Sequence, residues 1–466
     1  MGIEFDASLI SELASIVGQE YVYTDTESAT FYGSDWTKVY KPAPGAVILP
    51  KTIKQVQALV QLANREDIAI VPSGGRTGLS GGAVAARGEL LIALDNLNTI
   101  HKFNVTDRTV VCGAGVITER LQEFANQQDL FYPVDFSSSG SSQIGGNIST
   151  NAGGMRVIRY GMTRDWVVGL KVVTGNGFLL DLNKGLKKNN AGYDLRQLFI
   201  GSEGTLGIVV EATMQLSRPP IDLSVLVLGL HDMSGIMDVL NTFQKEIDLT
   251  AFEFFSELAL EKVVAHSDLN QPFEASTEYY VLLEFENFSS KTEQLVMNLF
   301  RRCVKQGWVV DGIMSQNTSQ LQNLWKLREE ISESIAQWTP YKNDISVLPS
   351  MVPEFLVDVG SFLSNQYKDF EVIWFGHIGD GNMHLNILKP DGLEIDEFHK
   401  CCELVSKQVF SIVQRYDGSI SAEHGVGLLK KDYLSYSCSK EEINLMKQIK
   451  LAFDPKLIMN PGKIFE

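Results

Sequence analysis

Apolar residues recur along the first half of the chain with the spacing of helices and strands in turn. Residues 7–17 have a helical repeat, and a second helix follows a candidate N-cap at Thr52. The apolar face of that second helix would consist of Ile53, Val56, Leu59, Val60 and Ala63. Short apolar runs predict strands at 45–49, 68–71, 90–94, 109–112, 167–173, 178–181 and 208–215. This mixture of elements favours an α+β fold.

The pattern is interrupted at residues 217–220, where two prolines would end any strand or helix. Beyond them, strands are expected at 223–230 and 279–285, and helices at 234–247 and 291–306. Antiparallel strands alternating with helices favour a ferredoxin-like second domain. A last helix is expected at 441–452.

Composition and charge narrow the class of protein. The chain has 466 residues, enough for two or three domains, and its net charge is −17 with a pI of about 5.0. Such a charge argues against nucleic acid as a partner. We find neither a secretory signal nor an apolar run long enough to span a membrane. The five cysteines are scattered, so we expect reduced thiols in a cytoplasmic protein.

A glycine-rich loop follows the strand expected at 68–71. Residues 72–82 contain five glycines within nine positions, which would let a phosphate oxygen approach the backbone N–H groups closely. We expect this approach at Gly75. The following run at 90–94 predicts a strand, and the loop lacks a Gly-Lys-Ser/Thr ending, so it is neither a Rossmann turn nor a P-loop. The pattern therefore predicts a pyrophosphate held by a loop alone.

Further blocks of small residues lie at 137–154, 159–161 and 201–207. Their spacing would let several backbone segments converge on one flat, phosphorylated ligand. With the loop at 72–82, these blocks make the chain resemble flavoproteins of the vanillyl-alcohol-oxidase fold. Among them it is most similar to the D-2-hydroxyacid dehydrogenases, which include D-lactate and D-2-hydroxyglutarate dehydrogenases. The resemblance extends from about Gly45 to the C-terminus.

The resemblance implies a two-lobed FAD-binding domain at 1–218, a substrate domain with a metal site at 219–425, and a tail at 426–466 that returns to the FAD domain. We expect non-covalent FAD, because no cysteine or histidine stands near the glycine loop in the context used for attachment. The residues implied to bind FAD are Pro72, Ser73, Gly74, Gly75, Arg76, Thr77, Gly78, Pro133, Asp135, Ser141, Gly145, Gly146, Asn147, Thr150, Asn151, Gly153, Glu203, Gly204, Ile208 and Asn460.

Three of the seven histidines lie in two short segments, 376–384 and 421–427. His377 and His384 flank a Gly-Asp-Gly turn, which would allow both rings to face one site despite their odd spacing. Two imidazoles and a carboxylate suit a catalytic zinc or a non-haem iron. The resemblance implies a divalent metal, typically zinc, on His377, His384 and Glu423. It also implies that His424 is the catalytic base, whereas we expect Asp380 to hold the turn.

A basic segment follows residue 324. Residues 325–332 have a helical pattern that would place Arg328 and Ser332 on one face, and Lys342 comes after a proline. From the spacing alone, a solvated helix remains an alternative. The resemblance implies that Arg328, Ser332, Lys342, Asn386 and His424 bind substrate. Ser332 stands where the family has threonine, which leaves the chain-length preference open.

The sequence therefore predicts an FAD-dependent, metal-assisted oxidation of a D-2-hydroxyacid, favoured as D-2-hydroxyglutarate, with hydride transfer to flavin N5. The alternative within the family is a D-lactate dehydrogenase. Outside it stand a metal-dependent hydrolase or oxygenase with nucleotide-binding loops, and a non-catalytic flavin electron-transfer subunit. An electron-transfer flavoprotein or a quinone would accept the electrons, and a homodimer is compatible with the sequence.

Overall fold

The computed structural model describes residues 5–465, and the chain divides into two compact units. Unit 1 contains the chain up to Gly153, residues 162–219, and everything from Glu423 onward. Unit 2 contains residues 154–161 and 220–422. The sequence-based boundary after residue 425 differs by three residues from the division observed after Ala422.

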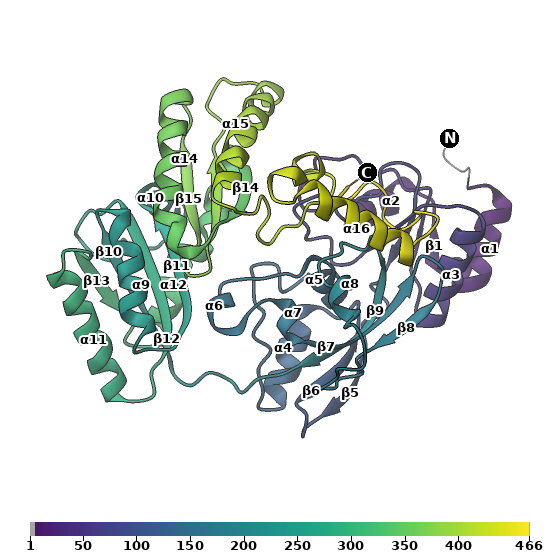
Figure 1. Ribbon diagram of the computed structural model, residues 1–466, viewed down its shortest axis with the longest axis horizontal. Helices are drawn as coiled ribbons and strands as arrows, with labels where there is room; N and C mark the ends of the chain where they lie inside the picture. Colours follow the sequence, from purple (N-terminus) through teal and green to yellow (C-terminus); the bar gives the residue numbers. More distant parts are fainter. Residues whose placement is uncertain (1–4, 466) are drawn as a thin grey trace. The chain divides into compact units, whose positions relative to one another are not determined.

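Unit 1 is built on two sheets (Figure 1). The first has the order β1-β2-β4-β3, and β2, β4 and β3 run parallel. Its strands are β1 (Val22–Tyr23), β2 (Ala46–Ile48), β3 (Ile70–Ser73) and β4 (Leu90–Ala93). The second sheet is antiparallel and has the order β5-β6-β9-β7-β8. Its strands are β5 (Ile100–Asn104), β6 (Thr109–Gly113), β7 (Val167–Thr174), β8 (Leu179–Leu182) and β9 (Gly207–Gln215).

The helices of unit 1 begin where the sequence supplies caps. In α3, the Thr52 hydroxyl accepts the N–H of Gln55, and the Gln55 amide oxygen accepts the N–H of Thr52, which forms a capping box. The buried face of α3 contains Val56, Leu59, Val60 and Ala63. The helices are α1 (Ala7–Val17), α2 (Thr26–Gly33), α3 (Ile53–Arg65), α4 (Thr118–Gln127), α5 (Ile144–Thr150), α7 (Thr163–Trp166), α8 (Arg196–Phe199) and α16 (Lys440–Phe453).

The C-terminal segment belongs to unit 1, as the yellow ribbon of Figure 1 shows. Asn460 N–H donates to Ile70 O, and Ile70 N–H donates to Ile458 O, so the tail pairs with β3. The buried Lys450 ammonium holds the same tail by donating to Asp454 and Met459 O. The tail is therefore an integral part of the unit.

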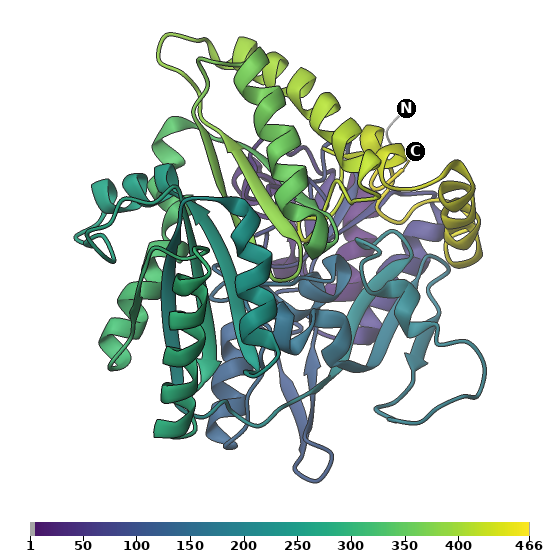
Figure 2. The same ribbon diagram turned by 60° about the vertical axis from the view of Figure 1, so that its left-hand side comes forward.

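Unit 2 is a seven-stranded antiparallel sheet of order β13-β10-β12-β11-β15-β16-β14 (Figures 1 and 2). Its strands are β10 (Leu223–Leu230), β11 (Leu249–Ser256), β12 (Tyr279–Glu286), β13 (Asp311–Met314), β14 (Tyr341–Ser346), β15 (Val372–His377) and β16 (Asn382–Ile387). Its helices are α6 (Val157–Tyr160), α9 (Ile236–Gln244), α10 (Glu257–His266), α11 (Ser290–Lys305), α12 (Thr318–Glu329), α13 (Ile331–Ser334), α14 (Val352–Gln366) and α15 (Ile395–Arg415).

The two faces of this sheet have different covers. Helices α10, α12 and α13 pack with Val225, Phe255 and Phe375 in one apolar cluster. Helix α9 packs on the sheet with α11 beside it (Figure 1), and α15 packs on β14 with α14 beside it. Because strand residues alternate between the two faces of a sheet, the strand register determines which side chains point to the sheet face that α12 covers.

One expected helix differs from the structure. The sequence favoured a continuous helix over 325–332, but α12 ends at Glu329 and the short α13 begins at Ile331. Arg328 and Ser332 therefore do not share one helix face, as their i, i+4 spacing had suggested. Arg328 is buried, whereas Ser332 is exposed.

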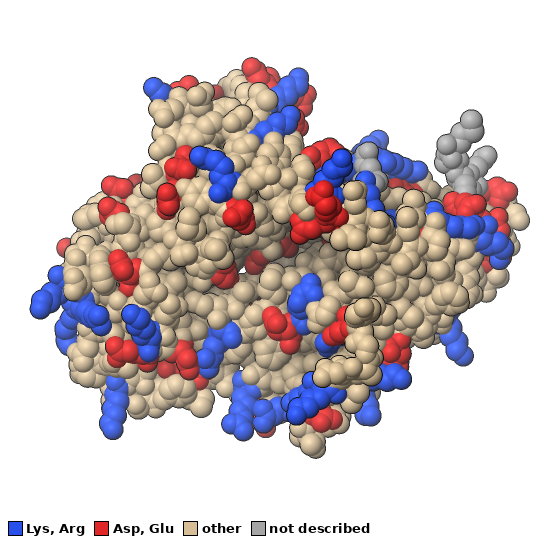
Figure 3. Space-filling view, in the orientation of Figure 1, with Lys and Arg blue, Asp and Glu red and all other residues tan. Residues whose placement is uncertain are grey.

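In the part of the chain that the structure describes, no helix is long and apolar enough to cross a membrane. Lysine and arginine side chains are interspersed with acidic ones over the face in Figure 3. Such mixed charges are typical of a solvent-exposed surface.

Candidate functional site

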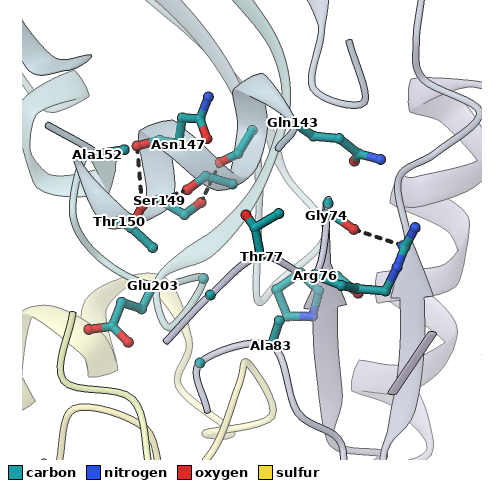
Figure 4. A pocket seen from close by; sticks show the side chains of 18 of the residues that line it. Gly74, Arg76, Thr77, Ala83, Gln143, Asn147, Ser149, Thr150, Ala152 and Glu203 are labelled. Carbon is teal, nitrogen blue, oxygen red and sulfur yellow. Dashed lines mark hydrogen bonds between the residues drawn. The ribbon is translucent and has the colours of Figure 1, made fainter. Parts of the chain in front are cut away.

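A pocket in unit 1 lies between the glycine-rich loop and α5 (Figure 4). The loop leaves β3 at Ser73 and reaches β4 at Leu90, with no helix between them. This confirms the strand–loop–strand order expected from the sequence. The lining includes residues 72–80 of the loop, most of 143–153, and Glu203, Gly204 and Ile208. Several backbone segments therefore converge on one cavity.

The glycines of this pocket serve different purposes. A Cβ built on Gly78 or Gly146 would meet no protein atom within 4 Å, so the cavity side of both residues is open to a ligand. A Cβ on Gly75 would overlap Ser141 O and lie 2.8 Å from Ser142 Cα. The expectation that Gly75 leaves room for a phosphate was therefore wrong, because its missing side chain leaves room for the neighbouring backbone.

The donor and acceptor groups of the pocket fit a phosphorylated cofactor such as FAD. Gly78 and Gly146 present backbone with no side chain in the way, which suits the close approach of a pyrophosphate. Gln143 lines the cavity, and its buried Oε1 has no hydrogen-bond partner among the described residues. A buried acceptor without a partner carries a free-energy cost that a ligand donor would remove.

Arg76 supports the loop through its side chain. Its guanidinium donates to Gly74 O at 2.8 Å and pairs with Asp95, at 2.9 Å from Oδ1 and 3.1 Å from Oδ2. It also lies over the rings of Phe31 and Tyr32. The contact with Gly74 is drawn in Figure 4. Since these contacts engage the guanidinium, Arg76 reaches the pocket mainly as a backbone element in the left-handed region.

Five of the expected cofactor residues lie outside the pocket lining: Pro133, Asp135, Ser141, Asn151 and Asn460. Two of them are attached to the segments that line the pocket. Asn460 Nδ2 donates to Gly82 O and to Glu203 O, while Asn151 ends α5 in the left-handed conformation. The other expected residues line the pocket.

Glu203 fastens the segment that contains the expected base. Its carboxylate accepts the N–H groups of Val426 at 2.7 Å and Gly427 at 2.8 Å. Burial raises the pKa of Glu203, and these two hydrogen bonds oppose that shift. Glu423 and His424, immediately before, line the same pocket of unit 1. The sequence identified Glu203 as a cofactor residue, and its side chain is engaged in holding this segment.

A separate group of polar residues lies on one face of the sheet in unit 2. Phe255 pairs with Phe375, and Phe375 pairs with His384. By alternation, Glu253 of β11 and His377 of β15 share the face of these residues. On β14, Asp344 pairs with His384 and Lys342 pairs with Asn386. Register alone therefore gathers the polar side chains of four strands: Glu253, Lys342, Asp344, His377, Asn382, His384 and Asn386.

The two histidines lie close together on this face. Their ring centroids are 5.4 Å apart and the rings are nearly perpendicular, at 84°. The hairpin between β15 and β16 makes this proximity possible, as expected from the Gly-Asp-Gly turn. Gly381 adopts a positive φ there, and Asp380 accepts the N–H of Asn382. Asp380 therefore holds the turn, as expected.

Each imidazole has a buried carboxylate at its Nδ1 atom. Glu253 Oε1 lies 2.9 Å from His377 Nδ1, and Asp344 Oδ1 lies 3.6 Å from His384 Nδ1. Asp344 also accepts Asn382 Nδ2 and the N–H of Ala422. Glu253 was not expected to belong to the site, although an acid alone within an apolar strand is a signal that it is paired.

The expected substrate residues occupy different places. Arg328 is 5% exposed, stacks over Phe375, and lies with Nη2 2.9 Å from Glu253 Oε2. Its Nε has no hydrogen-bond partner among the described residues, and neither has the buried Nδ2 of Asn386. Lys342 and Asn386 share the polar face, whereas Ser332 is exposed on α13. Arg328, Lys342 and Asn386 thus belong to the polar sheet region of unit 2.

Comparisons with known proteins decide the family. Residues 44–183 match the family described as FAD binding domain, and residues 220–464 match FAD linked oxidases, C-terminal domain. The chain is 60% identical over 460 residues to D-2-hydroxyglutarate dehydrogenase of Stutzerimonas stutzeri (strain A1501), covering 99% of both chains. It is 34% identical over 465 residues to the mitochondrial D-2-hydroxyglutarate dehydrogenase of Arabidopsis thaliana, covering 98% of this chain and 82% of the relative. The chain belongs to the FAD-dependent D-2-hydroxyacid dehydrogenases.

Solved structures agree on the fold. A 4-ethylphenol oxidase from Gulosibacter chungangensis superposes with a TM-score of 0.77 at 17% identity, covering 98% of this chain and 97% of that one. An alkyldihydroxyacetonephosphate synthase gives 0.74 at 17% identity, covering 99% and 86%. The α+β fold of vanillyl-alcohol-oxidase type is confirmed.

Family membership also settles the reaction class. This flavoprotein is an oxidoreductase that acts on the CH–OH group of a D-2-hydroxyacid. The alternatives of a hydrolase and of a non-catalytic electron-transfer subunit are thereby set aside.

Proposed function

We propose that this dehydrogenase oxidises D-2-hydroxyglutarate to the 2-oxoacid with the help of a divalent metal, favoured as zinc, on His377, His384 and Glu423. The observation that carries the proposal is the polar face of the sheet in unit 2. There, the ring centroids of His377 and His384 are 5.4 Å apart. The buried guanidinium of Arg328 contacts Glu253, which also contacts His377. The two relatives named above support the choice of substrate.

The donor set supports a metal. Two neutral imidazoles with carboxylates behind them and one carboxylate ligand are a common arrangement for a metal that keeps one coordination position for substrate. Bound there, the metal would act as a Lewis acid that lowers the pKa of the substrate hydroxyl. The N–H of Ala422 donates to Asp344. Glu423 follows Ala422 directly, so its Cα atom is about 3.8 Å from that of Ala422.

The charges support a substrate with two carboxylates. Arg328 is buried with unused N–H donors, and Lys342 is on the same face of the sheet. Arginine can bind one carboxylate bidentately, and the lysine ammonium supplies a second positive charge. Asn386 contributes a buried Nδ2 donor without a partner among the described residues. The buried donors of Arg328 and Asn386 together with the exposed charge of Lys342 would suit two carboxylates better than one.

His424 is proposed as the base that removes the hydroxyl proton. It lines the cofactor pocket of unit 1, and it is two residues after Ala422, which is bound to Asp344 in unit 2. The chain limits the Cα atoms of residues 422 and 424 to about 7 Å apart. An imidazole titrates near neutral pH, which suits a general base.

We further propose non-covalent FAD, a cytoplasmic location, and an electron-transfer flavoprotein or quinone as the acceptor. FAD supplies the hydride acceptor when bound. None of the pocket-lining residues in the described part of the chain is a cysteine, and His424, the histidine among them, is assigned to the proton.

Anaerobic reduction of the bound flavin tests the proposal. Purified enzyme is mixed with D- and L-2-hydroxyglutarate, D-malate and D-lactate, and the loss of absorbance near 450 nm is followed, with metal content measured on the same sample. We expect fastest bleaching with D-2-hydroxyglutarate and none with the L-enantiomer. Faster bleaching with D-lactate would favour the D-lactate dehydrogenase alternative. Full activity in rigorously metal-free enzyme would overturn the metal assignment.

A further inference from the structure

Glu253 is a buried acid that contacts two functional side chains at once. Its side chain is 1% exposed and lies on β11, between apolar neighbours of the strand. Oε1 is 2.9 Å from His377 Nδ1, and Oε2 is 2.9 Å from Arg328 Nη2. Each carboxylate oxygen therefore faces a different group. All three residues belong to unit 2.

The contact with His377 fixes how the imidazole is presented. Nδ1 faces a carboxylate oxygen, so a neutral ring that donates from Nδ1 to this oxygen would carry its lone pair on Nε2. A carboxylate behind a ligand histidine also orients the ring and raises its basicity toward a metal. Asp344 has the corresponding place behind His384, with its Oδ1 at 3.6 Å from Nδ1.

The contact with Arg328 fixes the guanidinium. Arg328 Cζ is 4.7 Å from the centre of the Phe375 ring. Its Nη2 forms an ion pair with Glu253 Oε2 at 2.9 Å, and neither of these two atoms has a hydrogen-bond partner among the described residues. The Nε donor then remains without a partner among the described residues. Glu253 thus leaves donor capacity on the arginine while balancing its charge in a buried setting.

We propose that Glu253 is a positioning residue shared by the metal ligand His377 and the substrate anchor Arg328. This inference rests on the proposed function of the site, because the contact with His377 matters for a bound metal and the contact with Arg328 matters for a substrate carboxylate. Glu253 touches neither directly. It sets the metal affinity through the imidazole and the dicarboxylate affinity through the guanidinium.

Glu284 provides a matched control. It is a fully buried acid on the same sheet face, one strand away on β12. It binds Arg156 through two contacts of 2.9 and 3.2 Å and also accepts Trp325 Nε1. Its carboxylate is as buried as that of Glu253, whereas Arg156 is 17% exposed and Arg328 is 6% exposed. Its described contacts include no histidine. Glu284→Gln should therefore reproduce the structural cost of losing a buried acid without the metal effect.

The test measures zinc affinity on FAD-loaded enzyme stripped of metal, by competition with a chromophoric chelator. We expect Glu253→Gln to weaken zinc binding by about 10–100-fold, and Glu284→Gln to change it by less than about 3-fold. At saturating zinc, Glu253→Gln should raise KM for D-2-hydroxyglutarate more than KM for D-lactate. FAD content should stay at the wild-type level, since the cofactor pocket is in unit 1.

A double variant keeps the test valid if Glu253→Gln does not fold. Glu253→Gln together with Arg328→Met removes both charges of the ion pair, so no arginine is left buried without a counter-charge. We expect its zinc affinity to remain about 10–100-fold below that of Arg328→Met alone. An equal affinity in these two variants would overturn the role of Glu253.

The outcomes separate the two proposals. If wild-type enzyme binds no zinc or other divalent metal, the proposed metal site fails, and the role of Glu253 toward it fails as well. If wild-type enzyme binds zinc and Glu253→Gln binds it equally well, the metal site stands and the positioning role is wrong. Unchanged KM values for both substrates in Glu253→Gln would remove the link to Arg328.

Discussion

Gly75 packs directly against the backbone of Ser141, so that a Cβ on the glycine would overlap the Ser141 carbonyl oxygen. This contact joins the loop after β3 to the segment before α5. Gly74 is close behind, with its added Cβ 3.7 Å from Gly146 Cα. The two glycine-rich segments are thus held together by the absence of side chains, and the cofactor pocket is the space that remains beside them.

Substitutions at two glycines should separate folding from cofactor binding. We expect Gly75→Ala to destabilise unit 1 strongly, because backbone atoms must move. Gly78→Ala should leave the thermal unfolding of the apoprotein nearly unchanged, since its Cβ would meet no protein atom within 4 Å. It should nevertheless weaken FAD retention, measured as the ratio of absorbance at 450 to that at 280 nm. Full FAD retention in Gly78→Ala would show that no ligand group approaches this glycine.

Substitution of either proposed histidine ligand should remove the metal and leave the flavin bound. His377→Ala and His384→Ala should each lose bound metal and turnover, because each removes one proposed ligand. Both should keep stoichiometric FAD, since the cofactor pocket is formed by unit 1 residues. Metal analysis and the flavin spectrum measure the two properties. His266→Ala, at the exposed end of α10, is the control and should keep both. Retained metal in both ligand variants would contradict the prediction.

Arg328→Met predicts a change in substrate preference. Loss of a charge-assisted hydrogen bond costs about 1.5–3 kcal/mol, which is roughly one to two decades in kcat/KM. We expect that loss for D-2-hydroxyglutarate and a much smaller one for D-lactate, which lacks the distal carboxylate. Lys326→Met removes an exposed charge from the same helix and should change neither. Equal losses for both substrates would instead place Arg328 at the shared C1 carboxylate.

The lowered pKa of the buried Lys463 ammonium should make the stability of the protein depend on pH. Burial lowers the pKa of its ammonium to about 8, against 10.5 for the free side chain, despite the opposing charges of Glu89 and Glu203. Between these two values the unfolded chain binds the proton and the folded one releases it, so this group makes stability rise with pH. Below about pH 8 both states are charged and the gain is absent.

The measurement compares wild type with Lys463→Met. Chemical unfolding at pH 7 and pH 9.5 should show wild type gaining on the variant by about 1–3 kcal/mol as the pH rises. A free-energy difference that does not change with pH would mean that Lys463 keeps its ordinary pKa in the folded protein.

The elements that were predicted from the sequence are present in the structure, whereas strands such as β11, β15 and β16 were not predicted. Helix α1 begins and ends at the expected residues 7 and 17, β10 has its expected bounds, and the cap at Thr52 is confirmed. Other strand ends differ by one or two residues, as with β3. These elements were predictable because periodicity and capping are local properties.

The contacts of the site were less readable. Glu253 is separated from Arg328 by 75 positions and from His377 by 124, so their meeting depends on strand order and register. The break between α12 and α13 was missed because the sequence has neither proline nor glycine there. Asn460 lies outside the pocket lining and holds lining segments through its side-chain Nδ2, which donates to Gly82 O and Glu203 O, and composition does not reveal such contacts.

The tail that pairs with β3 has a consequence during protein synthesis. Strand β3 is at the edge of its sheet, and Ile70 exchanges backbone hydrogen bonds with Ile458 and Asn460, nearly four hundred residues later. This edge therefore stays uncovered in a nascent chain until residues 458–460 have been synthesised. Prematurely terminated chains would expose the strand next to the glycine loop, which makes them targets for aggregation or quality-control proteolysis rather than partly active enzymes.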